Sequence, residues 1–232
     1  MSESTEKETP NLIEFHGPLD LGDPVPFRAV EAIPDWLKHM ETAEPGPGNE
    51  PIGTAKRCPP LVDAISCGYI IPLRRTIRFM LRDAETLLYE SVGDNEVVSG
   101  QERPAYQGAP FEKSIVIKFR NSWIVKTPPG YSTLFLPVLN RVDFPFHVLS
   151  GLVDTDVFYR ETVFPSVCLM KPGSEVILEK GTPLVQAIPF KREAWQLKIV
   201  NWDVERRLES EVDFMVTRQR YKRKHWQKKE YR

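Results

Sequence analysis

The sequence has no long hydrophobic run and few of the residues that build disulfides or metal sites. No apolar segment approaches the roughly 20 residues that a membrane-spanning helix needs, so we expect no membrane segment. The three cysteines (Cys58, Cys67 and Cys168) are odd in number and match no metal-ligand spacing. Free thiols in a reducing cytoplasm are the expectation. The polar, acidic residues 1–10 resemble neither a secretory signal nor an Arg-rich transit peptide.

The composition is that of an ordinary globular protein, but the charge is unevenly distributed. The chain has 232 residues, of which 41% are hydrophobic and 27% charged, and its net charge is -1. Between Arg218 and Arg232, eight basic residues and one acidic residue give +7, so the remainder carries -8. A cationic tail on an acidic body can bind that body, a partner protein or phosphates.

Short apolar segments separated by proline and glycine predict a mainly β chain with a few helices (α+β). Their spacing is typical of a sandwich or barrel. We expect strands over 13–16, 69–71, 77–81, 87–90, 115–119, 123–125, 131–136, 146–153, 163–170, 175–178, 184–190 and 195–200. We expect helices over 33–40 (docking Trp36), 61–66 and 204 to about 224.

Composition also suggests four consecutive regions. Residues 1–12 offer too little apolar surface to offset the entropy of ordering, so we expect them to be disordered. Residues 13–110 form an N-terminal region of short helices and strands, in which 93–110 is a long polar loop that is either functional or mobile. A β core over 111–203 and a helix with a basic tail over 204–232 complete the chain.

Two aspartates at the end of an apolar strand are the first candidates for chemistry. Asp154 and Asp156 are two residues apart, so a continuing strand would place both on one face. Such a pair can bind a cation, or hold a sugar hydroxyl while activating water. The alternative is a β-turn, where aspartate is favoured.

His147 precedes these aspartates on another predicted strand. A metal-dependent enzyme using His147, Asp154 and Asp156 is one hypothesis, although a single imidazole on a strand is more often packed and hydrogen-bonded, and we assign no metal site. Gln186 stands among apolar neighbours, where its amide either contacts a ligand or satisfies a backbone edge.

The segment from Gly151 to Asp156, with the turn Glu179-Lys-Gly181 and the strand containing Val185-Gln186, resembles the third and fourth motifs of the dUTPase and dCTP-deaminase superfamily. The resemblance implies a dUTPase-like distorted β-barrel with an irregular N-terminal region and a C-terminal helix. It implies a catalytic role for Asp154, which would position the attacking water, with Tyr159 near the sugar and Gln186 at the phosphates. It also implies a homotrimer whose C-terminal arm covers a neighbour's site.

The phosphate-binding elements of that superfamily are absent. Where dUTPases carry Pro-Arg-Ser-Gly, this chain has Pro128-Pro-Gly-Tyr-Ser132, without arginine and with a proline that removes a backbone donor. No glycine follows Gly181, so a glycine-rich closing arm is missing as well. We therefore favour a non-catalytic barrel that binds a ligand or protein partner.

The alternative is a nucleotide-acting hydrolase of dUTPase type. In it, Lys126, Ser132, Asp156, Tyr159 and Gln186 contact the nucleotide. Mg²⁺ is implied as a cofactor only in that case.

A second resemblance covers nearly the whole chain. A family of unknown function found in bacteria and tailed phages is similar in six segments. They are Ile33-Pro-Asp-Trp-Leu37, Cys58-Pro-Pro60, Gly68-Tyr-Ile-Ile-Pro72, Lys126-Thr-Pro-Pro-Gly-Tyr-Ser132, Val153-Asp-Thr-Asp156 and Val185-Gln-Ala-Ile-Pro-Phe-Lys-Arg-Glu-Ala-Trp195. This resemblance implies that the protein is located in the cytoplasm of a bacterial or phage-infected cell. It does not indicate any particular activity.

The basic tail, residues 218–232, interleaves Tyr221, Trp226 and Tyr231 with lysine and arginine. This composition is used to bind single-stranded nucleic acid by stacking and phosphate contact. The alternative, which we favour, is a helix that packs its aromatic side chains on the body and leaves its lysines in water.

Overall fold

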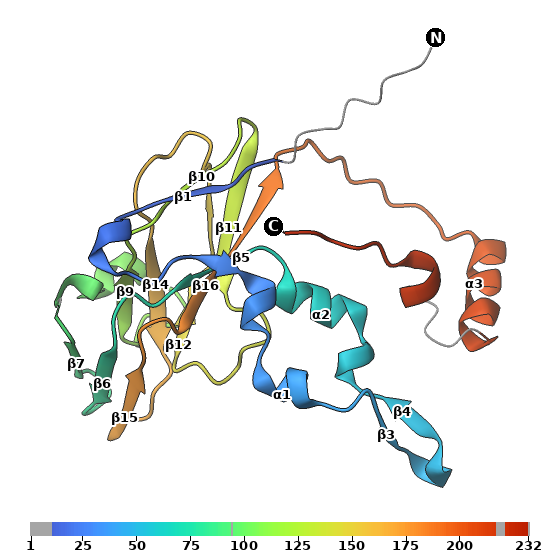
Figure 1. Cartoon of the computed structure of the whole chain (residues 1–232), viewed down its shortest axis with the longest axis horizontal. Coiled ribbons are helices and arrows are strands. Elements are labelled where there is room, and N and C mark those ends of the chain that lie inside the picture. Colours follow the sequence, from blue (N-terminus) through green and yellow to red (C-terminus); the bar gives the residue numbers. More distant parts are fainter. Residues whose placement is uncertain (1–10, 94, 217–220, 232) are drawn as a thin grey trace. The chain divides into compact units, whose positions relative to one another are not determined.

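The computed structural model describes residues 11–93, 95–216 and 221–231, and these are mainly β-strands (Figure 1). They divide into two compact units. The first contains residues up to 29 together with 68–192, and the second contains 30–67 together with the chain from 193 onward. Within the first unit, β-strands from residues 69–100 pair with β-strands from residues 116–191.

The largest sheet of the first unit has five strands in the order β13-β11-β16-β5-β2. β11 and β16 lie side by side in antiparallel register from Tyr131 opposite Lys191 to Pro137 opposite Val185 (Figure 1). The strands are β2 (Phe27–Arg28), β5 (Tyr69–Pro72), β11 (Tyr131–Pro137), β13 (Gly151–Val153) and β16 (Pro183–Lys191).

Three smaller sheets complete this unit, in the orders β12-β14-β9-β8, β15-β6-β7 and β1-β10. The predicted strands over 77–81 and 87–90 are confirmed as β6 and β7, which pair as an antiparallel hairpin. The strands are β1 (Glu14–His16), β6 (Ile77–Leu81), β7 (Leu87–Ser91), β8 (Val98–Gly100), β9 (Val116–Arg120), β10 (Ile124–Lys126), β12 (Phe146–Val148), β14 (Val163–Cys168) and β15 (Ser174–Leu178).

The core of the first unit is a cluster of aromatic and branched side chains contributed by these sheets. Phe79, Phe119 and Phe146 are buried, with ring centroids 4.7 Å apart for Phe79 and Phe146 and 5.4 Å apart for Phe119 and Phe146. Such edge and tilted contacts add to the free energy gained by burial. The predicted mainly β class is therefore confirmed.

The described strands do not close into the predicted barrel. The sequence suggested one continuous strand over 146–153, but this strand is interrupted at Leu149 and Ser150. β12 pairs with β14 in one sheet, whereas β13 pairs with β11 in another. The interruption therefore divides the predicted strand between two sheets. The core is enclosed by separate sheets, each with free edges, and not by one closed sheet.

The second unit holds the helices and a small hairpin. Helix α1 (Asp35–His39) buries Leu37, whereas Trp36 is 48% exposed, so the expected docking of the tryptophan is wrong. Adjacent helical positions point about 100° apart, and Leu37 occupies the inner one. The other elements are α2 (Pro59–Ser66), β3 (Ala43–Pro45), β4 (Pro51–Gly53), α3 (Val204–Val216) and a π-helical turn (Tyr221–His225).

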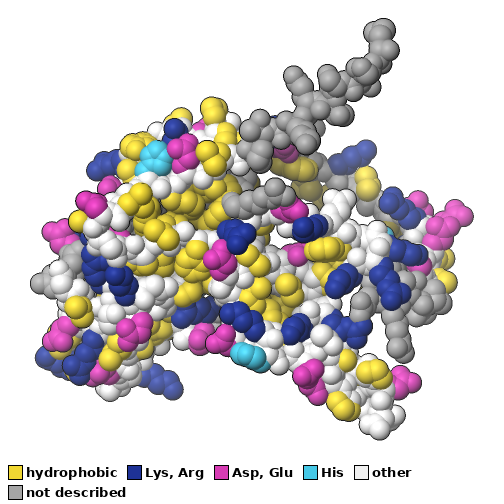
Figure 2. All heavy atoms as spheres, in the orientation of Figure 1, with side chains coloured by type: hydrophobic (Ala, Val, Ile, Leu, Met, Phe, Trp, Pro, Cys, Tyr) yellow, Lys and Arg dark blue, Asp and Glu magenta, His cyan; other side chains and the backbone are white. Residues whose placement is uncertain are grey.

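Residues 193–203 form no strand, contrary to the prediction for 195–200. The side chains of Trp195, Leu197 and Ile199 are 86–88% exposed. On α3, Leu208 and Val212 are also exposed. Figure 2 shows hydrophobic, acidic and basic side chains interspersed on the visible surface. The predicted continuation of this helix over 217–220 lies outside the described residues. None of the described helices is long and apolar enough to cross a membrane.

A buried carboxylate joins three segments of the first unit. Asp23 has no exposed side-chain surface and accepts hydrogen bonds from Arg74 (Nε, 2.9 Å), Arg75 and Ser122 (Oγ, 2.6 Å). Burial raises the pKa of Asp23, but the donors from Ser122 and the two arginines outweigh it and hold the pKa below its ordinary value. The carboxylate therefore stabilises the fold above about pH 3.9, and this contribution is lost as the pH falls through the lower folded-state pKa.

Asp23→Asn should lower the free energy of unfolding by about 3–5 kcal/mol, because two arginines lose their buried counter-ion. Urea unfolding at pH 7 measures the change, with the exposed Asp20→Asn as the matched control. Equal stability of the two variants would show that Asp23 does not hold these segments together.

Candidate functional site

The candidate site lies where two connections of the five-stranded sheet meet. One is the turn between β10 and β11, in which Gly130 has a φ of 85°, a left-handed conformation that favours glycine. The other follows β13, where the amides of Val157 and Phe158 donate to the carbonyl of Asp154 at 3.1 and 2.9 Å. Asp154 and Asp156 therefore lie in a turn after the strand, as the alternative interpretation predicted.

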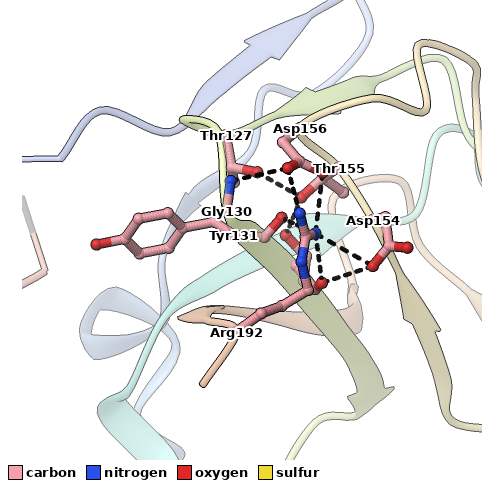
Figure 3. Close-up of polar contacts among 9 residues, drawn as sticks. Thr127, Gly130, Tyr131, Asp154, Thr155, Asp156 and Arg192 are labelled. Atoms are coloured by element: carbon pink, nitrogen blue, oxygen red, sulfur yellow. Dashed lines mark hydrogen bonds and ion pairs between the residues drawn. The ribbon is translucent and has the colours of Figure 1, made fainter. Parts of the chain in front are cut away.

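Arg192, at the end of β16, binds both aspartates (Figure 3). Its Nη1 lies 3.3 Å from Asp154 Oδ1 and 3.0 Å from Asp156 Oδ1, and its Nη2 lies 2.5 Å from Asp156 Oδ2. Nη1 also lies 2.9 Å from the Tyr131 carbonyl and 3.0 Å from Ser132 Oγ. A planar guanidinium is suited to this bidentate contact with a carboxylate.

Hydroxyl and amide donors complete the coordination of the two carboxylates. The Gly130 amide donates to Asp156 Oδ2 at 2.9 Å, and Ser132 Oγ donates to Asp154 Oδ1 at 2.7 Å. Behind them, Thr155 Oγ1 lies 2.7 Å from Thr127 Oγ1 and 2.8 Å from Thr133 Oγ1. All three threonines and Ser132 are buried, so this network ties the turns to the sheet.

The electrostatics of the cluster disfavour proton transfer at Asp156. The hydrogen bonds from Arg192 and from the Gly130 amide lower the pKa of Asp156 to about 2. Asp156 in turn raises the pKa of Arg192. Asp156 is therefore charged at neutral pH, far from the pKa that suits a general acid or base. Two carboxylates and one guanidinium leave the cluster with a charge of -1.

Gln186 does not lie with the aspartates. It is fully buried, and its Oε1 accepts a hydrogen bond from the Leu139 amide at 3.0 Å. It is opposite Leu136, whereas Phe190 is opposite Ser132, which places Gln186 about 13 Å along the strands from the aspartate cluster. The contact fits the alternative in which the amide satisfies backbone groups.

Lys126 and Tyr159 belong to a separate group of polar residues around Glu14. Lys126 Nζ lies 3.7 Å from Glu14 Oε1, and His16 Nε2 lies 2.8 Å from Glu14 Oε2. The Tyr159 hydroxyl lies 2.8 Å from His16 Nδ1, and the two rings meet edge-on. Of the predicted site residues, the structure thus joins Ser132, Asp154 and Asp156 and places Lys126, Tyr159 and Gln186 elsewhere.

His147 is exposed on β12 and lines a hollow of about 450 Å³ with Phe146, Leu169 and the loop after β11. In the described part of the chain, no group of three His, Cys, Asp or Glu side chains could hold a metal ion. His147, Asp154 and Asp156 therefore do not form the metal site that a metal-dependent enzyme would need. His147 lies on β12, and the aspartates lie in the turn after β13, a strand of a different sheet.

The sequence did not reveal Arg192 as a member of the site. Its position follows from the antiparallel register that places Lys191 opposite Tyr131, and this register joins segments about 60 residues apart. A weak signal exists: a basic pair, Lys191-Arg192, ends a strand in a chain with two clustered aspartates.

Comparisons with known proteins find no matching family model and no matching curated sequence. Solved structures do match. They include the native EIAV dUTPase (TM-score 0.36, 11% identity, 60% of this chain and 85% of that chain) and a mutant dUTPase of phage phi11 of S. aureus (0.35, 11%, 59% and 84%). A mutant dUTPase of Staphylococcus bacteriophage 80alpha also matches (0.34, 10%, 59% and 87%). Similarity at this level carries no conclusion about activity.

Arg192→Gln should raise the pKa of Asp156 from about 2 toward the ordinary value of about 3.9, since only the backbone hydrogen bonds of Gly130 and of Asp156 itself would still stabilise the anion. A carboxyl-carbon NMR titration measures this pKa. The contribution of Asp156 to stability is present above about pH 3.9 and disappears as the pH falls toward 2, so Arg192→Gln should weaken the fold chiefly above that range.

Lys191→Gln, which removes a neighbouring exposed charge, is the matched control and should leave the pKa of Asp156 low. An unchanged pKa in Arg192→Gln would contradict the assigned ion pair.

Proposed function

We propose that the chain is a non-catalytic β-sheet protein that binds a protein partner, and that the cluster of Asp154, Asp156 and Arg192 is structural. The observation that carries this proposal is the engagement of both aspartates by the chain's own arginine. Asp154 is the residue that would position water in a dUTPase-like site, and here it is hydrogen-bonded to Ser132 and paired with Arg192.

Phosphate binding at this cluster is disfavoured by charge. The cluster carries -1, so a triphosphate would be repelled unless a cation intervened. Nη1 and Nη2 of Arg192 already face carboxylate, carbonyl and hydroxyl oxygens. Lys126, the other basic candidate, is directed to Glu14.

A nucleotide-acting hydrolase of dUTPase type is the second candidate, and one observation favours it. The side chain of Asp154 is 59% exposed, and a serine and an arginine lie beside it. The Pro-Pro-Gly turn itself contains no arginine, but Arg192 contacts the carbonyl of Tyr131, the residue after that turn. For hydrolysis it would have to release Asp156 and turn toward a phosphate.

For the partner, we propose a second copy of this chain, joined through the apolar segment of residues 195–202. Trp195, Leu197 and Ile199 alternate with polar residues and are almost fully exposed. Val200 and Trp202 are each 68% exposed. Each exposed tryptophan presents about 150–250 Å² of surface, so this segment approaches the few hundred Å² beyond which monomers seldom expose an apolar patch. Each copy also offers free sheet edges for an added strand. The resemblance to dUTPases suggests three copies.

Asp154→Asn should leave the binding of deoxynucleotides unchanged, because the wild-type chain should bind none of them. A thermal-shift screen with deoxynucleoside mono-, di- and triphosphates, with and without Mg²⁺, measures this. A ligand at 100 times its dissociation constant would stabilise the fold by about 2.7 kcal/mol, which is readily detected. A selective shift with dUTP that survives in Asp154→Asn would instead support the hydrolase.

The double variant Trp195→Glu, Leu197→Glu should reduce self-association at least tenfold, because two buried apolar contacts would be replaced by charge. Light scattering across a concentration series measures the mass. Gln196→Glu, Lys198→Glu adds acidic residues at the intervening polar positions and serves as the control. A monomeric wild-type chain at all concentrations would remove the second copy as the partner.

A further inference from the structure

The described part of the basic tail folds back onto the second unit. Trp226 Nε1 donates to Asp63 Oδ2 of α2 at 2.8 Å, and Lys229 Nζ lies 2.8 Å from the same oxygen. Lys224 pairs with Asp213 of α3, and Lys228 pairs with Glu230. Within the second unit, the tail is thus held on α2 and α3 by the Trp226 hydrogen bond and by two ion pairs, those of Lys224 and Lys229. This agrees in part with the predicted packing of the tail on the body.

Tyr221, at the start of this folded-back segment, lines a second hollow, which no residue of the aspartate cluster lines. The hollow has a volume of about 580 Å³, within the range of ligand pockets. The Tyr221 side chain is 40% exposed there. The other lining residues are Pro51, Gly53, Thr54, Arg57, Cys58, Pro59 and Pro60.

Basic side chains line this hollow or follow its tyrosine in the sequence. Arg57 lines it, and Lys222 and Arg223 follow Tyr221 in the exposed π-helical turn. Within residues 11–93, 95–216 and 221–231, Lys222 and Arg223 have no ion pair or hydrogen bond, and no carboxylate lines the hollow. The neighbouring acid on α2, Asp63, is already held by Trp226 and Lys229.

We propose that this hollow binds a base of single-stranded nucleic acid. The base stacks on the ring of Tyr221, and the flanking phosphates contact Lys222, Arg223 and Arg57. Every base offers a π-face for stacking, and lysine and arginine beside an aromatic ring are the usual means of holding an unpaired strand. In a duplex the bases are stacked on one another, so their faces are closed to Tyr221.

A proline-rich peptide fits the same hollow less well. Grooves that bind such peptides are lined by aromatic side chains, whereas this one has a single tyrosine and three prolines of its own. The surrounding positive charge favours a polyanion. Binding here is independent of self-association through residues 195–202.

The experiment uses the full chain and fluorescence anisotropy with a labelled 12-nucleotide oligothymidylate, its RNA equivalent, and a duplex of the same length. We expect binding of both single strands and at least tenfold weaker binding of the duplex. Three phosphate contacts predict a slope of about -2 in log K against log salt, or about a 20-fold loss between 50 and 200 mM.

Tyr221→Ala should weaken binding by about 5- to 150-fold, the range for loss of one stacked base, while Tyr221→Phe should retain it. Tyr159→Ala, at an exposed tyrosine of the other unit, is the matched control. Arg223→Gln should reduce the magnitude of the salt slope by about 0.7. Circular dichroism checks that each variant is folded.

Three results would overturn the proposal. They are no binding of single strands at 50 mM salt, equal affinity of Tyr221→Ala and wild type, and a preference for the duplex. Binding of a proline-rich peptide that is lost in Tyr221→Ala, without binding of oligonucleotides, would assign the hollow to a protein ligand instead.

Discussion

The first unit depends on Arg192, because this side chain allows two aspartates to stand in one turn. Unpaired carboxylates this close would repel each other and raise each other's pKa. The guanidinium binds both, and it reaches the carbonyl of Tyr131 and the hydroxyl of Ser132 as well. It thereby joins the end of β16, the start of β11 and the turn after β13 (Figure 3). These three strands are neighbours in the largest sheet.

Local sequence patterns predicted the elements whose partners are close in the chain. The hairpin of β6 and β7 was evident from two apolar segments separated by a short polar one. Non-local pairing was not evident. The break at Leu149 and Ser150 moves the chain between sheets, and the register that brings Arg192 to Asp156 spans distant segments. The aspartate cluster was therefore found from sequence, but its arginine was missed.

The polar groups that bond within the chain and the groups that remain exposed to solvent lie in different parts of the structure. The cluster of Asp154, Asp156 and Arg192 directs its polar groups to one another, and Gln186 is buried against the backbone. By contrast, residues 195–202 and the hollow beside Tyr221 leave apolar, aromatic and cationic groups open to water. Both features belong to the second unit. This distribution favours a binding role for the second unit and a structural role for the polar cluster of the first unit.

The most direct test of the structural role of the aspartate cluster is phosphorus-31 NMR of the wild-type chain incubated with dUTP, dCTP and Mg²⁺. We expect no pyrophosphate or phosphate above the level of a protein-free sample, because Ser132 and Arg192 already engage Asp154. Release of pyrophosphate that is abolished by Asp154→Asn would show that the cluster is catalytic and would establish the dUTPase-like hydrolase.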